Sequence, residues 1–134
     1  MFGKLAACAS AGMIILCATQ FAQAKTQTVR DPQLTVAAGK KTSLRDLYAW
    51  DKKCRPLNIS FRPGMSLSGK LYTVNDKFRV NGAPNDPCNG KSVSGKRVIF
   101  EANPGFKGKT TVSYTVKTPN YPDTFIFMRP LRVR

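Results

Sequence analysis

The chain of 134 residues carries 22 lysines and arginines against 7 aspartates and glutamates, a formal net charge of +15 at neutral pH. It contains no histidine, which excludes the Ser-His-Asp and Cys-His arrangements of nucleophilic catalysis and argues against a zinc site. A field this positive attracts polyanions such as nucleic acid, acidic polysaccharide, lipopolysaccharide phosphates and anionic lipid headgroups.

The first 24 residues have the layout of a secretory signal peptide. Lys4 supplies a basic start, residues 5–18 are apolar, and residues 22–24 form an A-x-A cleavage site. We therefore predict cleavage after Ala24 and export to the periplasm or the extracellular space. One alternative is a lipoprotein site at Cys17, although leucine precedes it where a small residue is usual. The other is a retained membrane anchor, although the apolar run is at the short limit for a span.

Cleavage leaves one predicted domain, residues 25–134, which is long enough to bury a core of its own. Its only cysteines are Cys54 and Cys88. In an oxidising compartment, an isolated pair outside any CxxC motif predicts a structural disulfide rather than a redox or metal site. Closing this loop of about 35 residues stabilises the fold by roughly 4 kcal/mol in the chain-entropy model.

Beyond the signal peptide, apolar and polar residues alternate with period two, and turn residues interrupt the pattern about every eight to twelve positions. This pattern predicts an all-β fold, a sandwich or a barrel. The predicted strands are, in chain order, residues 34–37, 57–61, 69–74, 77–80, 97–102, 110–116 and 124–134.

Four places interrupt or qualify this pattern. The dipeptide Asn75-Asp76 predicts a tight hairpin turn. Residues 42–50 fit either one helical turn, because their apolar residues are spaced three and four apart, or an irregular strand. Pro130 predicts that the last strand lies at a sheet edge or carries a bulge, because proline cannot donate to a ladder. Residues 81–96, rich in Gly, Pro, Asn and Ser, form a predicted loop that the disulfide holds.

The stretch NPGFKGKTTVSYTV, residues 103–116, places a turn directly before a regular strand. Pro104 and Gly105 make the turn, and Phe106 can insert its ring into the end of a core. Gly108 can adopt backbone angles that other residues reach only at a cost. We therefore predict that this stretch closes one end of the core.

In sequence this stretch resembles the bacterial immunoglobulin-like and cadherin-like modules of secreted proteins, in which NPGFxGxDxFxYxV precedes the penultimate strand. The resemblance implies a single immunoglobulin-like β-sandwich over residues 25–134. Two positions depart from the pattern, because Thr110 replaces its aspartate and Val112 replaces its aromatic residue. The matching residues are Asn103, Pro104, Gly105, Phe106, Gly108, Tyr114 and Val116.

The number and the scattered positions of the acidic residues argue against both metal binding and catalysis. Calcium, which some modules of this kind bind, requires several oxygen ligands, and glycoside chemistry requires paired carboxylates. The acidic residues here are scattered, and no SxxK motif follows the signal peptide. We therefore predict no metal, no cofactor and no enzymatic activity. The acidic residues are Asp31, Asp46, Asp51, Asp76, Asp86, Glu101 and Asp123.

Binding is thus the predicted class of function. Basic residues interleave with aromatic ones around the first cysteine of the disulfide and along residues 69–80, and further arginines end the chain. Such cations pair with phosphate or carboxylate oxygens, and exposed aromatic rings stack on sugars or bases. The alternative is that Trp50, Tyr72 and Phe78 are core residues and that the cations merely line solvent-facing strands. The candidate binding residues are Trp50, Lys52, Lys53, Arg55, Lys70, Tyr72, Lys77, Arg79, Arg129, Arg132 and Arg134.

We predict a non-catalytic binding module of the bacterial cell envelope that contacts an anionic polysaccharide, lipopolysaccharide, lipid headgroup or other polyanion. The alternative is an interaction module that binds another envelope or host protein through an edge strand, for which the strand with Pro130 is the candidate. Ionic strength separates the two hypotheses, because counterion release makes polyanion binding fall steeply with salt.

Overall fold

The computed structural model describes residues 23–134. The predicted signal peptide, residues 1–24, lies outside the described residues apart from its last two positions. Every regular element of the described part is a strand, and no helix there could cross a membrane. The strands are β1 (Thr26–Arg30), β2 (Leu34–Val36), β3 (Lys41–Leu47), β4 (Ser60–Pro63), β5 (Gly69–Arg79), β6 (Ser92–Ala102), β7 (Gly108–Lys117) and β8 (Thr124–Val133).

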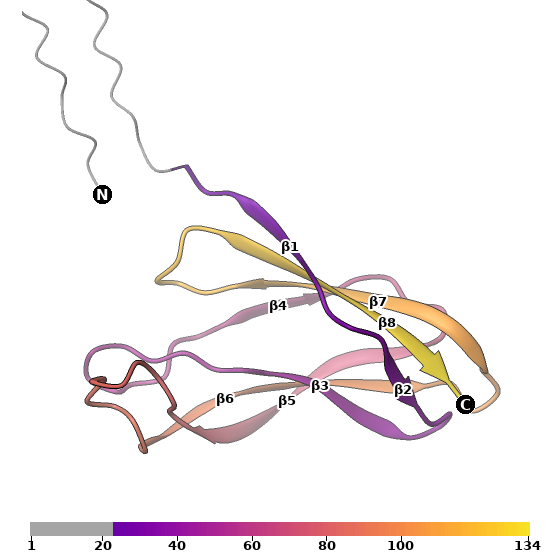
Figure 1. The fold of residues 1–134 in the computed structure, drawn as a ribbon, viewed down its shortest axis with the longest axis horizontal. Coiled ribbons are helices and arrows are strands. Elements are labelled where there is room, and N and C mark those ends of the chain that lie inside the picture. Colours follow the sequence, from indigo (N-terminus) through magenta and orange to yellow (C-terminus); the bar gives the residue numbers. More distant parts are fainter. Residues whose placement is uncertain (1–22) are drawn as a thin grey trace, which may run out of the picture.

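These strands form two sheets (Figure 1). One sheet has the order β3-β6-β5 and is antiparallel. In the other sheet, β4, β7 and β8 pair antiparallel in that order. On the far side of β8, β1 and then β2 pair with it in parallel, one after the other along its length. The predicted all-β class is confirmed.

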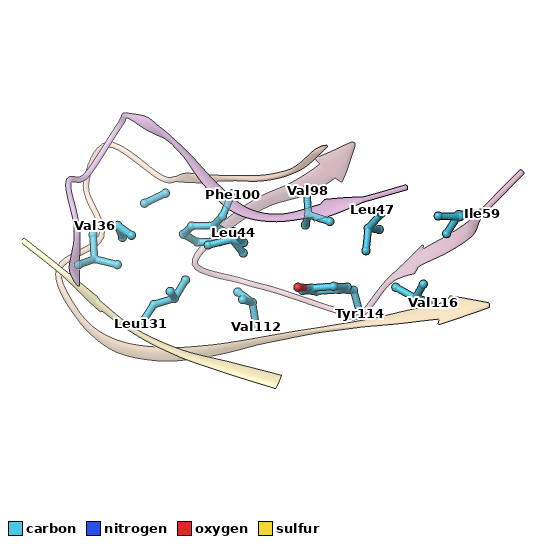
Figure 2. Close-up of a cluster of buried hydrophobic side chains, with 12 residues drawn as sticks. Val36, Leu44, Leu47, Ile59, Val98, Phe100, Val112, Tyr114, Val116 and Leu131 are labelled. Carbon is cyan, nitrogen blue, oxygen red and sulfur yellow. The ribbon is translucent and has the colours of Figure 1, made fainter. Parts of the chain in front are cut away.

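The main core lies between the two sheets, where alternate residues of the strands meet (Figure 2). Val112, Tyr114 and Val116 of β7 lie opposite Val98 and Phe100 of β6, and all are buried. Successive side chains of a strand point to opposite faces, so the polar residues between them point to solvent. Burying each such apolar side chain contributes about 1.5–3 kcal/mol, which explains why the period-two pattern specifies these strands.

A smaller core lies on the opposite face of the β5–β6 pair. Five positions separate Val93 from Val98 in β6, so these two buried side chains point to opposite faces of the sheet. The predicted disulfide Cys54–Cys88 is present and closes this second cluster by joining the β3–β4 connection to the β5–β6 connection. Its buried members are Val80, Cys88 and Val93, with Tyr48, Trp50 and Cys54 packed against them.

Strand β5 runs unbroken through Asn75 and Asp76, so the predicted hairpin turn at these residues is wrong. Both residues pair in register with β6. Asp76 forms an ion pair with Arg97 of that strand at 3.0 Å. The pairing of all eleven residues of β5 outweighs the local turn preference of Asn and Asp. The chain reverses instead between Arg79 and Ser92, so the irregular region is shorter than the predicted 81–96.

Two other predictions are refined. Residues 41–47 form β3 with a shift in register between Ser43 and Arg45, so the irregular-strand alternative for 42–50 is confirmed and the helical turn is wrong. Strand β4 occupies residues 60–63 rather than 57–61, because Leu57 bonds back to the carbonyl of Ala49 before the β7 ladder begins.

Strand β8 is central rather than an edge, and its pairing with β7 has no shift in register, so both predictions from Pro130 are wrong. The carbonyl of Met128 accepts a hydrogen bond from the Asp31 N–H on the β1 side. Because alternate residues of a strand direct their backbone groups to the same side, the nitrogen of Pro130 faces that side too. There β1 has ended at Arg30 and β2 begins only at Leu34, so no ladder bond requires the missing N–H.

The turn before β7 has the predicted form. The N–H of Phe106 donates to the carbonyl of Asn103 at 3.0 Å. Phe106 packs against the main core, and Gly108 adopts φ 123°, a region that side chains other than glycine avoid. Residues 103–108 therefore close one end of the core and start the strand that carries its centre.

Candidate functional site

Most acidic side chains of the described residues are neutralised by a neighbouring cation. The ion pairs are Asp31–Arg45 at 2.6 Å, Asp46–Arg97 at 3.1 Å, Asp51–Arg55 at 2.8 Å and Asp76–Arg97 at 3.0 Å. Asp86 and Asp123 accept hydrogen bonds instead, and Glu101 stands between Lys41 and Lys70 in the register of its sheet. The remaining cations therefore dominate the surface charge.

The outer face of the β4-β7-β8 sheet carries no acidic side chain among the described residues. Val112, Tyr114 and Val116 point into the core, so the intervening residues of β7 point outward, and the register extends this face across β1, β2, β4 and β8. Serine, threonine and a strip of Ile126, Met128 and Pro130 fill its centre. We call this surface the basic face. Its exposed cations are Arg30, Arg62, Lys109, Lys117 and Arg132.

Two of these cations oppose each other directly. Lys109 of β7 and Arg132 of β8 are cross-strand partners, and like charges at such positions destabilise an antiparallel pair. Thr35 of β2 is the partner of Arg132 on its other side. An anionic oxygen placed over these strands would meet a cation from each, together with a hydroxyl, and phosphate, sulfate and carboxylate all suit that arrangement.

The residues predicted to bind do not gather at one site. Arg132 lies on the basic face and Arg134 just beyond it at the end of β8. Along β5 the predicted residues split between two faces. Lys70 and Tyr72 share the outer face of their sheet with Phe78, and Lys77 and Arg79 point to the opposite side.

Another predicted group lies at the disulfide end of the molecule. The indole N–H of Trp50 donates to the Asp86 carboxylate at 3.1 Å, and its ring stacks with Tyr48. Trp50 also lines a groove of about 510 Å³ with Lys52. Lys53 and Arg55 are exposed, and Arg55 is paired with Asp51. The alternative hypothesis placed these aromatic residues in a core. The structure shows Phe78 buried and Tyr72 half-buried.

Arg129 points into the domain. Its guanidinium donates to the carbonyls of Pro32 and Leu44, both at 3.2 Å, and lies 3.7 Å from the Asp31 carboxylate. Only 15 % of its side chain is exposed. Its position in β8 has the same parity as the core residue Leu131, which is the sequence signal for this direction.

Arg45 and Tyr114 complete the cluster around Asp31. Burial raises the pKa of the Tyr114 phenol, although a hydrogen bond from the Arg45 Nε at 3.3 Å opposes the shift. Burial lowers the pKa of Arg45, but its hydrogen bonds to Asp31 and Tyr114 outweigh that effect and raise the pKa overall. Both groups therefore keep their protons at neutral pH. The cluster joins the two sheets, and its polar groups bond to one another and to backbone carbonyls rather than lying on the basic face.

Most cations of the basic face were missed by sequence reasoning, which weighted basic residues beside aromatic ones. These residues are Arg30, Arg62, Lys109 and Lys117. A usable signal was present, because no acidic residue occurs between Glu101 and Asp123 and the lysines of that stretch alternate with its buried positions.

No cluster of metal-ligating side chains occurs within residues 23–134. The chain matches no protein-family model and no curated protein at a significant level. Among solved structures it is similar to the solution structure of amebosin, with 16 % identity, a TM-score of 0.42, and coverage of 84 % of this chain and 100 % of that one. A similarity this low carries no conclusion about the fold or the function.

Proposed function

We propose that the protein is an exported, non-catalytic binding module of the cell envelope that holds an anionic polymer or headgroup on its basic face. The observation that carries this proposal is the segregation of charge. The exposed cations of the β4-β7-β8 sheet lie on a face without a carboxylate, whereas most acidic residues elsewhere are paired. The predicted signal peptide and the disulfide support export to an oxidising compartment.

We also infer an immunoglobulin-like sandwich, which the strand order supports. If β3 to β8 are named B to G, the sheets become B-E-D and C-F-G, the constant-type arrangement, with the first strands added beside G. The disulfide departs from the antibody pattern, because it joins the B–C and D–E connections rather than strands B and F. The second core covers part of the outer face of the β3-β6-β5 sheet, whereas the outer face of the β4-β7-β8 sheet is open to solvent, and the architecture itself specifies no activity.

The basic face favours a ligand recognised through its charge. Its outward positions hold hydroxyl and aliphatic side chains but no aromatic ring, so it lacks the stacking platforms on which single-stranded nucleic acids are bound. Phosphate, sulfate or carboxylate groups carried by a polysaccharide, a lipopolysaccharide or lipid headgroups fit its cations and hydroxyls better.

The test compares two variants of equal net charge. In the first, Arg62, Lys109 and Arg132 of the basic face are replaced by serine. In the second, the exposed Lys52, Lys53 and Lys77 are replaced by serine. The purified protein with its disulfide intact is titrated with heparin, lipopolysaccharide and single-stranded DNA at about 50 and 200 mM salt, a range over which several phosphate contacts lose orders of magnitude in affinity.

We expect the first variant to lose most of its affinity and the slope of log affinity against log salt to fall by about one per lost contact, while the second variant stays close to wild type. Equal losses in both variants would reduce the binding to net charge alone. No binding to any polyanion would overturn the proposal in favour of a protein partner at a free sheet edge. Candidate edges are then β1, β2, β3, β4 and β5, each of which pairs with one strand, rather than β8.

A further inference from the structure

The connection from β4 to β5, residues 64–68, is held along the edge of β7 by hydrogen bonds. The N–H of Gly64 donates to the Ser113 carbonyl at 2.8 Å, and the Ser68 hydroxyl lies 2.9 Å from that of Thr110. From the other side, Asn103 donates its backbone N–H to the Ser68 carbonyl at 2.9 Å and its side-chain amide to the Leu67 carbonyl at 3.1 Å. The conformation of this connection is therefore specified by the fold.

This hydrogen-bonded connection directs two large apolar side chains into solvent. Met65 is 92 % exposed and Leu67 is 89 % exposed, whereas the intervening Ser66 is half-buried and Ser68 is buried. The other large apolar residues with high exposure, Val74 at 40 % and Tyr121 at 45 %, are covered to about half. The serines of this connection are covered and hydrogen-bonded, whereas its large apolar side chains are exposed. A connection that only links two strands would be expected to expose its polar side chains and cover its apolar ones.

The apolar tip is bordered by cations of the basic face. Arg62 points outward from β4 two residues before the connection begins at Gly64, and Lys109 precedes Thr110, to which Ser68 is bonded. No acidic residue occurs between Asp51 and Asp76. Two protruding apolar side chains therefore stand beside positive charge, without a carboxylate in their own segment.

We propose that this tip, Met65 and Leu67, inserts into an anionic lipid surface while the neighbouring cations contact its phosphates. The electrostatic part rests on the proposed function and narrows its ligand to a bilayer surface, and the insertion rests on the tip alone. A protein partner suits the tip less well, because a specific interface requires roughly 800 Å² of each partner around a contiguous core. Interfacial insertion requires only a few apolar side chains that reach about 5–10 Å into the headgroup boundary, with cations beside them.

The experiment uses the purified protein and vesicles of phosphatidylcholine with and without about half phosphatidylglycerol. A double variant, Met65→Ser with Leu67→Ser, is expected to fold normally because both side chains are exposed, and its thermal unfolding checks this. We expect it to bind the anionic vesicles about tenfold more weakly or worse, from the apolar area that no longer leaves water, and to bind heparin as wild type does. A Leu67→Trp variant should show fluorescence quenching by lipids brominated near the headgroup, beyond any quenching of Trp50 in the wild type.

The outcomes separate the two proposals. Insertion is overturned if the double variant binds both heparin and vesicles as the wild type does, or if lipids do not quench the added tryptophan. Either result leaves the proposed function standing. Equal binding to neutral and anionic vesicles overturns the anionic lipid surface. Failure of the wild type to bind heparin and anionic vesicles alike overturns the proposed function itself.

Discussion

A charged cluster of three residues links the two sheets, and in it two arginines share one aspartate. Arg45 reaches the Asp31 carboxylate at 2.6 Å, and Arg129 approaches it at 3.7 Å while donating to two backbone carbonyls. Asp31 belongs to the short connection between β1 and β2. The cluster therefore ties the connection between β1 and β2 to both sheets, and removal of Asp31 would leave both arginines without their counter-charge.

Because of Tyr114, we expect the free energy of unfolding to fall as the pH becomes alkaline. Burial raises its pKa above the ordinary value, with opposition from Arg45, so the folded state holds the phenolic proton more tightly than the unfolded state does. Its contribution is complete below about pH 10 and is lost as pH rises through the higher pKa of the folded state. We expect urea unfolding between pH 8 and 11 to show a steeper loss of stability in the wild type than in Tyr114→Phe.

The Tyr114→Phe variant also loses the hydrogen bond with Arg45 at 3.3 Å, which should cost about 1 kcal/mol at neutral pH. Tyr121→Phe provides the control, because Tyr121 is 45 % exposed and should leave the alkaline profile unchanged. Identical profiles for wild type and both variants would show that the Tyr114 phenol does not control alkaline unfolding.

The sequence predicted the strands correctly wherever a strand buries the side chains of one face and exposes those of the other. The period-two alternation predicted strands at residues 110–116 and 124–134, where β7 and β8 lie, because a shift of one residue would expose the side chains that these strands bury. The same reasoning failed at Asn75-Asp76 in β5, where pairing along the whole of β6 overrides local turn chemistry. It also failed at Pro130, because only the break between β1 and β2 makes a proline acceptable in a central strand.

The candidate site was less predictable than the fold for a related reason. Sequence proximity joined Lys70, Tyr72, Lys77 and Arg79 into one surface, but their parity in β5 divides them between two faces. The basic face instead combines residues from strands far apart in the chain, such as Arg62 and Arg132, whose association depends on the order β4-β7-β8. Without knowledge of this strand order, these residues cannot be assigned to one surface from the sequence.

The second core depends on close packing over Gly95 of β6. A Cβ there would lie 2.6 Å from the Leu47 carbonyl oxygen, 2.7 Å from the Tyr48 Cβ and 3.0 Å from the Phe78 ring. Tyr48 and Phe78 stack at 4.9 Å between ring centroids. We expect Gly95→Ala to destabilise the domain by about 1–3 kcal/mol through overpacking and to alter the near-ultraviolet circular dichroism of the stacked rings.

The matched control for this prediction is Gly105→Ala. No atom lies within 4 Å of a Cβ at Gly105, so its free energy of unfolding, measured with urea, should change by about 0.5 kcal/mol or less. Equal stability of the two variants would mean that the chain leaving β3 adjusts freely over β6 and that the close approach at Gly95 has no energetic role.

At the scale of the whole molecule, charge is arranged against stability. A net charge of +15 repels itself in the compact state, and the acidic residues do not relieve the basic face, because they lie elsewhere. Stabilising such a domain requires the core, the second cluster and the disulfide to outweigh this repulsion. Natural proteins keep stability costs of this kind where they serve function, which supports a ligand that supplies the missing negative charge.

Lys109→Gln should therefore make the free protein more stable while weakening polyanion binding. Lys109 faces Arg132 across β7 and β8, and removing a directly opposed like charge should gain about 0.2–1 kcal/mol. The gain in unfolding temperature should be largest near 50 mM salt and shrink near 500 mM, where screening shortens the range of the repulsion. Lys53→Gln, which removes an exposed charge at the disulfide end, should change stability less. If Lys109→Gln instead lowers stability at low salt, repulsion on the basic face does not limit the fold, and its cations need no ligand to explain them.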